Sequence, residues 1–293
     1  MKGIILAAGK GTRLYPMTKV LCKPLLPIYD KPMIYYPLTT LLQAGIRDIL
    51  VIIPPDTEDS FSALLGDGHQ LGIHIEYKVQ HEARGIADAF IIGEEFINGQ
   101  DVCLALGDNI FWHENIRRRL KAAKEAAGGA TVFGYWVEDP RPFGVVEFDE
   151  KGRAISIEEK PSKPKSNYII PGLYFYDNKV VEMAKTLELS ARGELEITDI
   201  NLKYMELGEL QVVTLPQDCF WMDTGTSDTL LDAANQVKAL KQKGHLLGYI
   251  EMEAYEQGLI DAGQLTYLQD QLESTEYGKT IAASLKYTNE NNL

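Results

Sequence analysis

A glycine-rich segment stands directly after the first apolar run of the chain, and its residue types are suited to binding an anion. It reads Leu6-Ala7-Ala8-Gly9-Lys10-Gly11-Thr12-Arg13-Leu14. Glycines let backbone N–H groups approach a phosphate closely. Leu14 stands where the dinucleotide fingerprint needs its third glycine, which disfavours an NAD-dependent oxidoreductase, and the Gly-Lys-Ser/Thr ending of a P-loop is absent. The segment therefore predicts a phosphate-binding loop of another type.

The charge around this segment is opposite to that of the whole chain. The 293 residues include 42 acidic and 29 basic side chains, which gives a formal net charge of −13. Nevertheless, cations alone precede the first acid, Asp30: Lys2, Lys10, Arg13, Lys19 and Lys23. Such a reversal is expected where a triphosphate is held. The alternative is a solvated basic patch beside a tight turn.

Two aspartates follow strand-like segments far apart in the sequence. Asp108 stands just past the end of the apolar run 102–106, and Asp223 ends Trp221-Met222-Asp223. Ligands of open parallel sheets bind beyond the carboxyl ends of the strands, so both acids are well placed for chemistry. Mg²⁺ is typically bound by one or two carboxylates together with phosphate oxygens. The pair predicts a Mg²⁺ site; the alternative is that each aspartate caps a turn or a helix.

A second group of polar residues, Glu158-Glu159-Lys160-Pro161, ends a predicted strand in the middle of the chain. Lys160 and Glu159 have the chemistry to hold the phosphate and a hydroxyl of a sugar phosphate, although the same tetrad is also typical of a solvated turn. The five histidines are scattered and form no H-E-x-x-H motif, so a histidine zinc site is not expected.

Composition limits the class of protein. Hydrophobic residues make up 45% and charged residues 24%, the ordinary globular proportions. An acidic chain is a poor candidate for nucleic-acid binding, and no apolar run approaches the roughly 18–20 residues of a membrane span. Cys22, Cys103 and Cys219 are too far apart to indicate a disulfide framework, so we expect a cytoplasmic protein with neither nucleic acid nor membrane as partner.

The order of apolar segments predicts the elements that position these residues. In the first half, strands alternate with helices of about ten residues, which indicates an α/β fold with a mostly parallel mixed sheet flanked by helices. The expected strands are 1–8, 48–53, 73–79, 102–106 and 131–137, and the expected helices are 32–44, 57–65, 86–96 and 114–126.

The second half predicts a different arrangement. Short strands joined by turns indicate a small antiparallel insertion lying over the edge of the sheet, followed by further helices and strands. The last fifty residues are helical and carry eight acids against two lysines, as expected of an accessory segment or an interface. The expected strands are 145–148, 154–158, 170–176, 210–215 and 219–222, and the expected helices are 197–207, 227–243, 254–259, 262–272 and 277–285.

Taken together, these motifs resemble the sugar-phosphate nucleotidyltransferases, and within them the glucose-1-phosphate thymidylyltransferase branch. The resemblance is densest in the glycine loop and in the segments that surround the two carboxylate motifs. The matching segments are 9–18, 23–27, 29–38, 65–68, 90–94, 106–111, 172–177 and 191–199.

The resemblance implies a Rossmann-like nucleotidyltransferase fold that uses Mg²⁺. The implied reaction joins dTTP and α-D-glucose 1-phosphate into dTDP-glucose and pyrophosphate, the first step of dTDP-L-rhamnose and related deoxysugar pathways. Such enzymes are typically homotetramers inhibited by dTDP-rhamnose at a second site between subunits. The implied organisation is a nucleotidyltransferase domain over 1–243, in which residues 1–137 bind the nucleotide and residues from about 138 to 225 bind the sugar, and a helical accessory or oligomerisation segment over 244–293.

The family's site residues transfer to this sequence by position. The resemblance implies a catalytic group of Arg13, Lys23, Asp108 and Lys160. It implies Mg²⁺ binding by Asp108 and Asp223, and glucose 1-phosphate binding by Gly144, Glu159, Lys160 and Tyr174. The implied nucleotide site comprises Leu6, Ala8, Gly9, Gly11, Thr12, Arg13, Gln80, Gly85 and Asp108.

The sequence departs from the branch at several positions, including Trp112-His113, where Tyr-Gly is common. Pro24 replaces a common glutamine and cannot donate a hydrogen bond, Phe143 replaces a tyrosine, and Pro171 replaces a threonine. The alternatives are therefore a UTP-using or broad-specificity sugar-1-phosphate nucleotidyltransferase, or a non-catalytic nucleotide-sugar-binding relative.

Overall fold

Four apolar segments of the N-terminal half form the parallel region of a large mixed sheet. The computed structural model describes residues 1–126 and 128–291, and side chains as far as residue 285. Strand β1 (Lys2–Leu6) lies between β4 (Asp48–Ile53) and β6 (Val102–Leu106), and β5 (His74–Val79) pairs with β4, all in parallel. Because helices cover both faces, β1, β4 and β6 are buried runs of apolar residues, whereas β5 alternates polar and apolar residues.

The middle of the chain extends this sheet. Strand β12 (Leu173–Tyr176) runs antiparallel between β6 and β8 (Ala130–Trp136), and β13 (Leu210–Thr214) pairs in parallel with β8. Within this large sheet, the described strands follow the order β10-β9-β11-β8-β12-β6-β1-β4-β5, with β13 beside β8. The fold class expected from the sequence is confirmed.

The placement of the antiparallel insertion was predicted incorrectly. Strands β9 (Gly144–Phe148) and β10 (Ala154–Glu159) continue the sheet rather than lying over its edge. The reason is β11 (Tyr168–Ile169), which pairs with both β8 and β9 and so joins the insertion to the sheet by hydrogen bonds.

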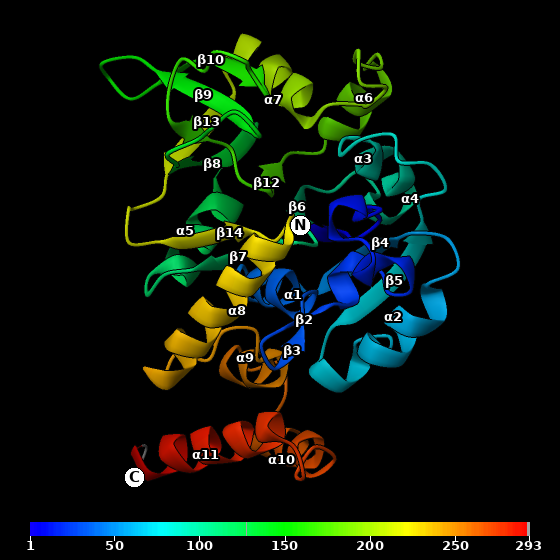
Figure 1. The fold of residues 1–293 in the computed structure, drawn as a ribbon, viewed down its shortest axis with the longest axis vertical. Coiled ribbons are helices and arrows are strands. Elements are labelled where there is room, and N and C mark those ends of the chain that lie inside the picture. The colour runs from blue at the N-terminus through cyan, green and yellow to red at the C-terminus, as the bar shows by residue number, and fades with distance from the viewer. Residues whose placement is uncertain (127, 292–293) are drawn as a thin grey trace.

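The helices cover the two faces of the sheet and enclose two apolar clusters (Figure 1). Successive strand residues point to opposite faces: Ile5 packs in the cluster that contains Leu38 and Leu41 of α1, whereas Ile4 packs in the cluster with Phe90 of α3. The described helices are α1 (Tyr35–Gln43), α2 (Glu58–Leu65), α3 (Asp88–Ile92), α4 (Glu94–Ile97), α5 (Ile116–Glu125), α6 (Val180–Lys185), α7 (Ile197–Glu206), α8 (Ser227–Gln242), α9 (Ile250–Glu256), α10 (Ala262–Asp270) and α11 (Glu276–Asn291).

Several element boundaries differ from the expectation for local reasons. Helix α1 begins late because Lys31–Pro32 (β3) pairs with Pro27–Ile28 (β2). The helix expected over 86–96 divides at Gly93, where a Cβ would lie 2.9 Å from the Ala89 carbonyl oxygen and from Ile4. Short 3-10 helices also occur at Thr12–Leu14, Met17–Lys19, Lys23–Leu25 and His69–Leu71.

The C-terminal helices attach in two ways. Ile250 and Ala254 of α9 pack in the same cluster as α1. Helices α10 and α11 lie at the end of the molecule away from β9 and β10 (Figure 1), and Leu265, Tyr277 and Ile281 form a separate apolar cluster there. None of the helices in the described part of the chain has the length and apolar character needed to cross a membrane.

Candidate active site

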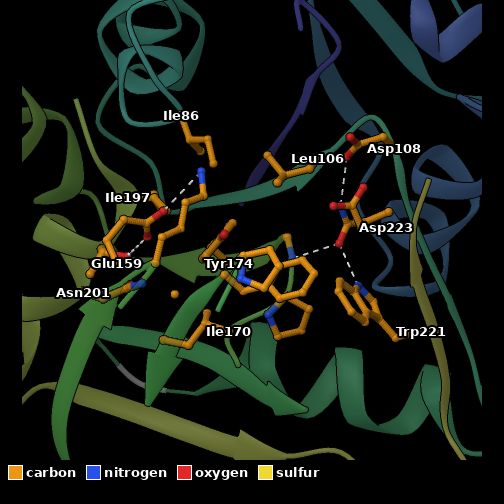
Figure 2. A pocket seen from close by; sticks show the side chains of 18 of the residues that line it. Ile86, Leu106, Asp108, Glu159, Ile170, Tyr174, Ile197, Asn201, Trp221 and Asp223 are labelled. Atoms are coloured by element: carbon orange, nitrogen blue, oxygen red, sulfur yellow. Dashed lines mark hydrogen bonds and ion pairs between the residues drawn. The ribbon is translucent and has the colours of Figure 1, made fainter. Parts of the chain in front are cut away.

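A pocket of about 430 Å³ opens beyond the carboxyl ends of β1 and β6. Its walls come from the glycine loop, from the start of β7 (Asn109–Trp112), from the insertion strands, from α7 and from the end of β14 (Phe220–Asp223). Figure 2 shows Asp108 and Asp223 at one end of this pocket and Glu159 at the opposite end. A pocket at this edge is where α/β sheets bind ligands.

The pairing of two short strands brings the distant aspartates together. Strand β7 runs antiparallel to β14, and its register sets Asp223 opposite Asn109, the residue after Asp108. The buried Lys23 ammonium group forms an ion pair with Asp108 and lies 3.9 Å from Asp223 Oδ1. Two carboxylates and one cation from three regions of the sequence therefore meet at one point.

Side chains without an expected role hold Asp108 in place. Asn109 Nδ2 donates to Asp108 Oδ1 over 2.9 Å, and Asn109 Oδ1 accepts from Trp221 Nε1 over 2.7 Å. The Thr224 hydroxyl donates to the Asp108 carbonyl oxygen over 3.0 Å. Both motifs containing these residues were visible in the sequence, but nothing local shows that they hydrogen-bond to each other.

The electrostatics of Asp223 are unusual for a carboxylate. Burial, and next the charge of Asp108, raise its pKa to about 6, although Lys23, Arg13 and Lys160 oppose this rise. Its Oδ1 is buried without a hydrogen-bond partner among the described residues. Buried polar atoms are nearly always paired, so this oxygen is free to bind a further positive group.

A cation site here would have few protein ligands and would leave coordination positions open to a substrate. Among the described side chains, no group of three or more His, Cys, Asp or Glu residues is suited to binding a metal. Asp108 and Asp223 thus offer a two-carboxylate site, the donor set that a hard cation such as Mg²⁺ uses when phosphate oxygens complete its shell. The residues present fit this metal.

The glycine loop contributes Arg13 to the pocket. A Cβ at Gly225 would lie 2.6 Å from Arg13 Nη2 and 2.9 Å from Asp223 Oδ1, so the guanidinium group packs against the turn that follows β14. Gly11 has a φ of 59° and packs against Lys23. Leu6 ends β1, Ala8 is buried, and Gly9 and Thr12 are exposed; none of these four lines the pocket itself.

Lys2 does not belong to the cationic group that the sequence indicated. It begins β1, whereas the loop follows the end of that strand. A five-residue strand separates the two by about 16 Å. Lys2 instead pairs with Asp48 over 3.4 Å and lies over the Phe96 ring. Of the cations that precede Asp30, Arg13 lines the pocket and Lys23 pairs with Asp108.

The two residues expected to contact the base, Gln80 and Gly85, do not line the pocket. Gln80 follows β5 and is 7% exposed, with its Nε2 donating to Asp88 Oδ2 over 2.9 Å. Gly85 has a φ of 104°, and a Cβ there would lie 2.5 Å from the Leu195 carbonyl oxygen. Only glycine fits this conformation and this close approach. Their proposed nucleotide contacts stay predictions.

The four residues expected at the sugar phosphate all line this pocket: Gly144, Glu159, Lys160 and Tyr174. Glu159 accepts hydrogen bonds from the Thr198 hydroxyl at 2.5 Å and from Arg192 at 3.2 Å. Lys160 has a φ of 43°, a left-handed conformation that few non-glycine residues adopt. Burial raises the pKa of Tyr174 far above neutral pH, so its hydroxyl keeps its proton.

The departures from the family pattern lie close to this site. Pro24 is buried, and a Cβ at Gly107 would approach its ring to 3.3 Å, so the proline packs beneath the strand end that carries Asp108. The Phe143 ring meets Trp221 edge to face with centroids 5.4 Å apart. Both residues support the pocket wall by apolar contact.

A pocket with two carboxylates and several cations at the edge of such a sheet is typical of phosphoryl and nucleotidyl transfer, and comparison with known families agrees. The family model described as nucleotidyl transferase matches residues 2–239. The chain therefore belongs to the nucleotidyl transferase family.

Individual relatives within this family have more specific names than the family model does. The chain is 52% identical to a glucose-1-phosphate thymidylyltransferase of Neisseria meningitidis, over 98% of this chain and 100% of the relative. A protein of the same name from Mycobacterium tuberculosis is 50% identical over 98% of this chain and 99% of the relative. A Bacillus anthracis protein solved with sucrose is 42% identical with a TM-score of 0.76, covering 81% of this chain and 95% of that one. These similarities confirm the family resemblance expected from the motifs.

Proposed function

We propose that this protein transfers a thymidylyl group from dTTP to α-D-glucose 1-phosphate, giving dTDP-glucose and pyrophosphate. The observation that carries the proposal is the single pocket with Asp108, Asp223 and Lys23 at one end and the hydrogen-bonded Glu159 at the other. The first set suits phosphates and the second suits sugar hydroxyls. Relatives about half identical over nearly the full length carry the name of this activity.

The reaction is an in-line displacement at the α-phosphorus of the nucleotide. A phosphate oxygen of the sugar phosphate forms the new P–O bond, and the bond to pyrophosphate breaks. Phosphate oxygens are ionised at neutral pH, so no side chain has to remove a proton. Arg13, Lys23 and Lys160 position the two anions and neutralise charge as it develops. Asn109 and Thr224 keep Asp108 fixed while this occurs.

Mg²⁺ belongs to this proposal as the cofactor. Asp108 and Asp223 would hold it, and it would neutralise the phosphate oxygens of the nucleotide when bound. Asp223 Oδ1 accepts no hydrogen bond among the described residues, and their side chains form no larger acidic cluster suited to a metal. Both observations support a metal shared with the substrate. Lys23, already paired with Asp108, keeps the two carboxylates close together until then.

The nucleotide site in this proposal extends from the glycine loop to the end of β5. Leu6, Ala8, Gly9, Gly11 and Thr12 cradle the phosphates, and Gln80 and Gly85 contact the base. Pro24 favours one competing possibility, a broader choice of nucleotide, because proline provides no hydrogen-bond donor.

The proposal also includes a location, an assembly and a feedback site. A nucleoside triphosphate as substrate implies a cytoplasmic enzyme. We assign residues 1–243 to catalysis, with the nucleotide over 1–137 and the sugar over about 138–225, and 244–293 to assembly of a homotetramer. Feedback by dTDP-rhamnose at a subunit boundary completes the proposal.

A pyrophosphate-release assay tests the function directly. The purified chain is supplied with glucose 1-phosphate, Mg²⁺ and, in separate reactions, dTTP, UTP, CTP, ATP or GTP. The highest kcat/KM is expected with dTTP. An equal or higher value with UTP would identify a uridylyl or broad-specificity transferase, and no release with any nucleotide would identify a non-catalytic relative.

Two variants test the metal assignment in the same assay. Asp108→Asn and Asp223→Asn are each expected to abolish turnover while the circular dichroism spectrum is retained. Near-wild-type rates in both variants would show that the metal assignment is wrong.

A further inference from the structure

Asn201 is a buried polar residue in the wall of the pocket that neither the sequence motifs nor the proposed mechanism uses. It lies on α7, one turn after Ile197 and Thr198, and all three residues line the pocket. Residues three and four positions apart share a face of a helix, so the face that carries Thr198 towards Glu159 also carries Asn201 inwards. Asn201 is only 1% exposed.

The two ends of the Asn201 amide have different surroundings. Its Oδ1 accepts a hydrogen bond of 2.6 Å from the Tyr176 hydroxyl. Its Nδ2 is buried and has no hydrogen-bond partner within the part of the chain that the structure describes. A buried donor without an acceptor costs roughly 1–3 kcal/mol, so this nitrogen would gain from an acceptor supplied by a ligand.

The neighbouring tyrosines fix which end of the amide is free. Tyr176 is fully buried, stacks on Tyr204 with centroids 5.4 Å apart, and donates its hydroxyl proton to Asn201. Tyr204 in turn donates to Asp177 over 2.7 Å. If the amide were reversed, the Tyr176 proton would lose its acceptor. The hydroxyl therefore holds the oxygen and leaves the nitrogen available.

The position in the pocket indicates which portion of a ligand this nitrogen meets. Figure 2 shows Asn201 beside Glu159, at the end of the pocket opposite Asp108 and Asp223. On the proposed function, on which this step rests, the sugar's C1 phosphate lies towards the aspartates and cations. The hydroxyls that reach Asn201 are then those remote from C1, on C3, C4 or C6.

We propose that Asn201 is a specificity-determining residue whose Nδ2 donates a hydrogen bond to a glucose hydroxyl remote from C1, with Tyr176 as the positioning residue that orients the amide. A neutral sugar hydroxyl accepts this bond without a change in charge, and it satisfies the one unpaired atom of Asn201. Glu159, an acceptor, and Asn201, a donor, together form a pair that recognises hydroxyls of a pyranose ring.

The experiment compares sugar discrimination in the wild type and in Asn201→Ala. Values of kcat/KM are measured with saturating dTTP and Mg²⁺ for glucose 1-phosphate and its 2-, 3-, 4- and 6-deoxy analogues. In the wild type, removing the bound hydroxyl leaves a buried donor unpaired, so one of the 3-, 4- or 6-deoxy sugars should lose about tenfold or more. In Asn201→Ala that loss should shrink to about twofold to threefold, whereas the effect of 2-deoxygenation should be unchanged.

The controls separate recognition from folding. Asn178→Ala removes an amide whose Nδ2 donates to the Gly99 carbonyl oxygen outside the pocket, and it should discriminate as the wild type does. Asn201→Asp keeps the oxygen that accepts from Tyr176 and removes the donor, so it replaces Asn201→Ala if that variant does not fold. Tyr176→Phe should reduce the discrimination partially, because the amide remains but is no longer oriented.

Three outcomes would overturn the assignment. The wild type could tolerate all three remote deoxy sugars equally well, or the Asn201 variant could keep the full wild-type discrimination. In either case the Asn201 assignment fails while the proposed function stands. If the wild type forms no product from any sugar phosphate, the proposed function fails and this assignment fails with it.

Discussion

Replacing Asp223 with asparagine is expected to stabilise the metal-free protein at neutral pH although it abolishes activity. Burial and the Asp108 charge raise the pKa of Asp223 from its ordinary 3.8 to about 6. Each pKa unit corresponds to about 1.4 kcal/mol, so ionising this carboxyl group costs the folded chain up to about 3 kcal/mol. The neutral amide of the Asp223→Asn variant has no such cost, and Lys23 would keep its ion pair with Asp108.

The effect has a defined dependence on pH. Between about pH 4 and pH 6 the folded chain binds the Asp223 proton more tightly than the unfolded chain does, so stability falls as pH rises through this range. The free energy of unfolding of Asp223→Asn should therefore match the wild type near pH 4 and exceed it increasingly up to pH 7. Above pH 7 the difference should be constant.

Urea unfolding in EDTA at several pH values between 4 and 8 measures this difference. Asp232→Asn, at an exposed position of α8, is the matched control and should change stability by less than about 0.5 kcal/mol. Added Mg²⁺ should stabilise the wild type and leave Asp223→Asn unaffected, because a ligand of the folded state alone raises its stability. A variant less stable than the wild type at pH 8, or a difference independent of pH, would refute the reasoning.

Three further substitutions test other regions of the structure. Arg13→Ala should lower kcat/KM by about 10²–10³, since a charged group aimed at transition-state charge contributes about 3–4 kcal/mol; a loss below fivefold would place Arg13 outside the reaction. Gly225→Ala should displace the Arg13 side chain, which lies 2.6 Å from the added Cβ, and lower kcat/KM about tenfold or more with a stability change within about 1 kcal/mol; wild-type kinetics would contradict that packing. Lys31→Met removes a buried cation that pairs with Asp30 over 2.5 Å and lies 4.2 Å from the Tyr249 ring, and should lower the free energy of unfolding by roughly 3 kcal/mol in urea titrations; an unchanged midpoint would show that the pair contributes nothing.

The sequence predicts the central sheet well because its signal is local. The segments that form β1, β4 and β6 are apolar runs, and helical segments alternate with strand segments in this half of the chain. This pattern specifies a parallel sheet without reference to other regions of the chain. The carboxyl ends of such strands lie at one edge, so the position of Asp108 could also be predicted.

The arrangement of the site around Asp108 depends on contacts that leave no local signal. Strand β7 pairs with β14, which lies far away in the sequence. Strand β7 begins directly after Asp108 and is only four residues long. Asn109 accepts a hydrogen bond from Trp221 and donates one to Asp108, and these bonds become apparent only once this pairing exists. The same holds for Asn201, since its role depends on the Tyr176 hydroxyl, which comes from a neighbouring strand.

The two ends of the pocket share one physical property. Asp223 Oδ1 and Asn201 Nδ2 are both buried without hydrogen-bond partners among the described residues, one an acceptor beside the cations and the other a donor beside Glu159. Each costs roughly 1–3 kcal/mol in the free chain, and the surrounding core has to offset that cost. Because the two atoms have opposite hydrogen-bonding character, a ligand satisfies both only if it brings a positive or donor group to one end and an acceptor, such as a hydroxyl oxygen, to the other. A metal-bound nucleotide with a sugar phosphate has this distribution of groups, whereas a metal-bound nucleotide without the sugar phosphate satisfies only the first.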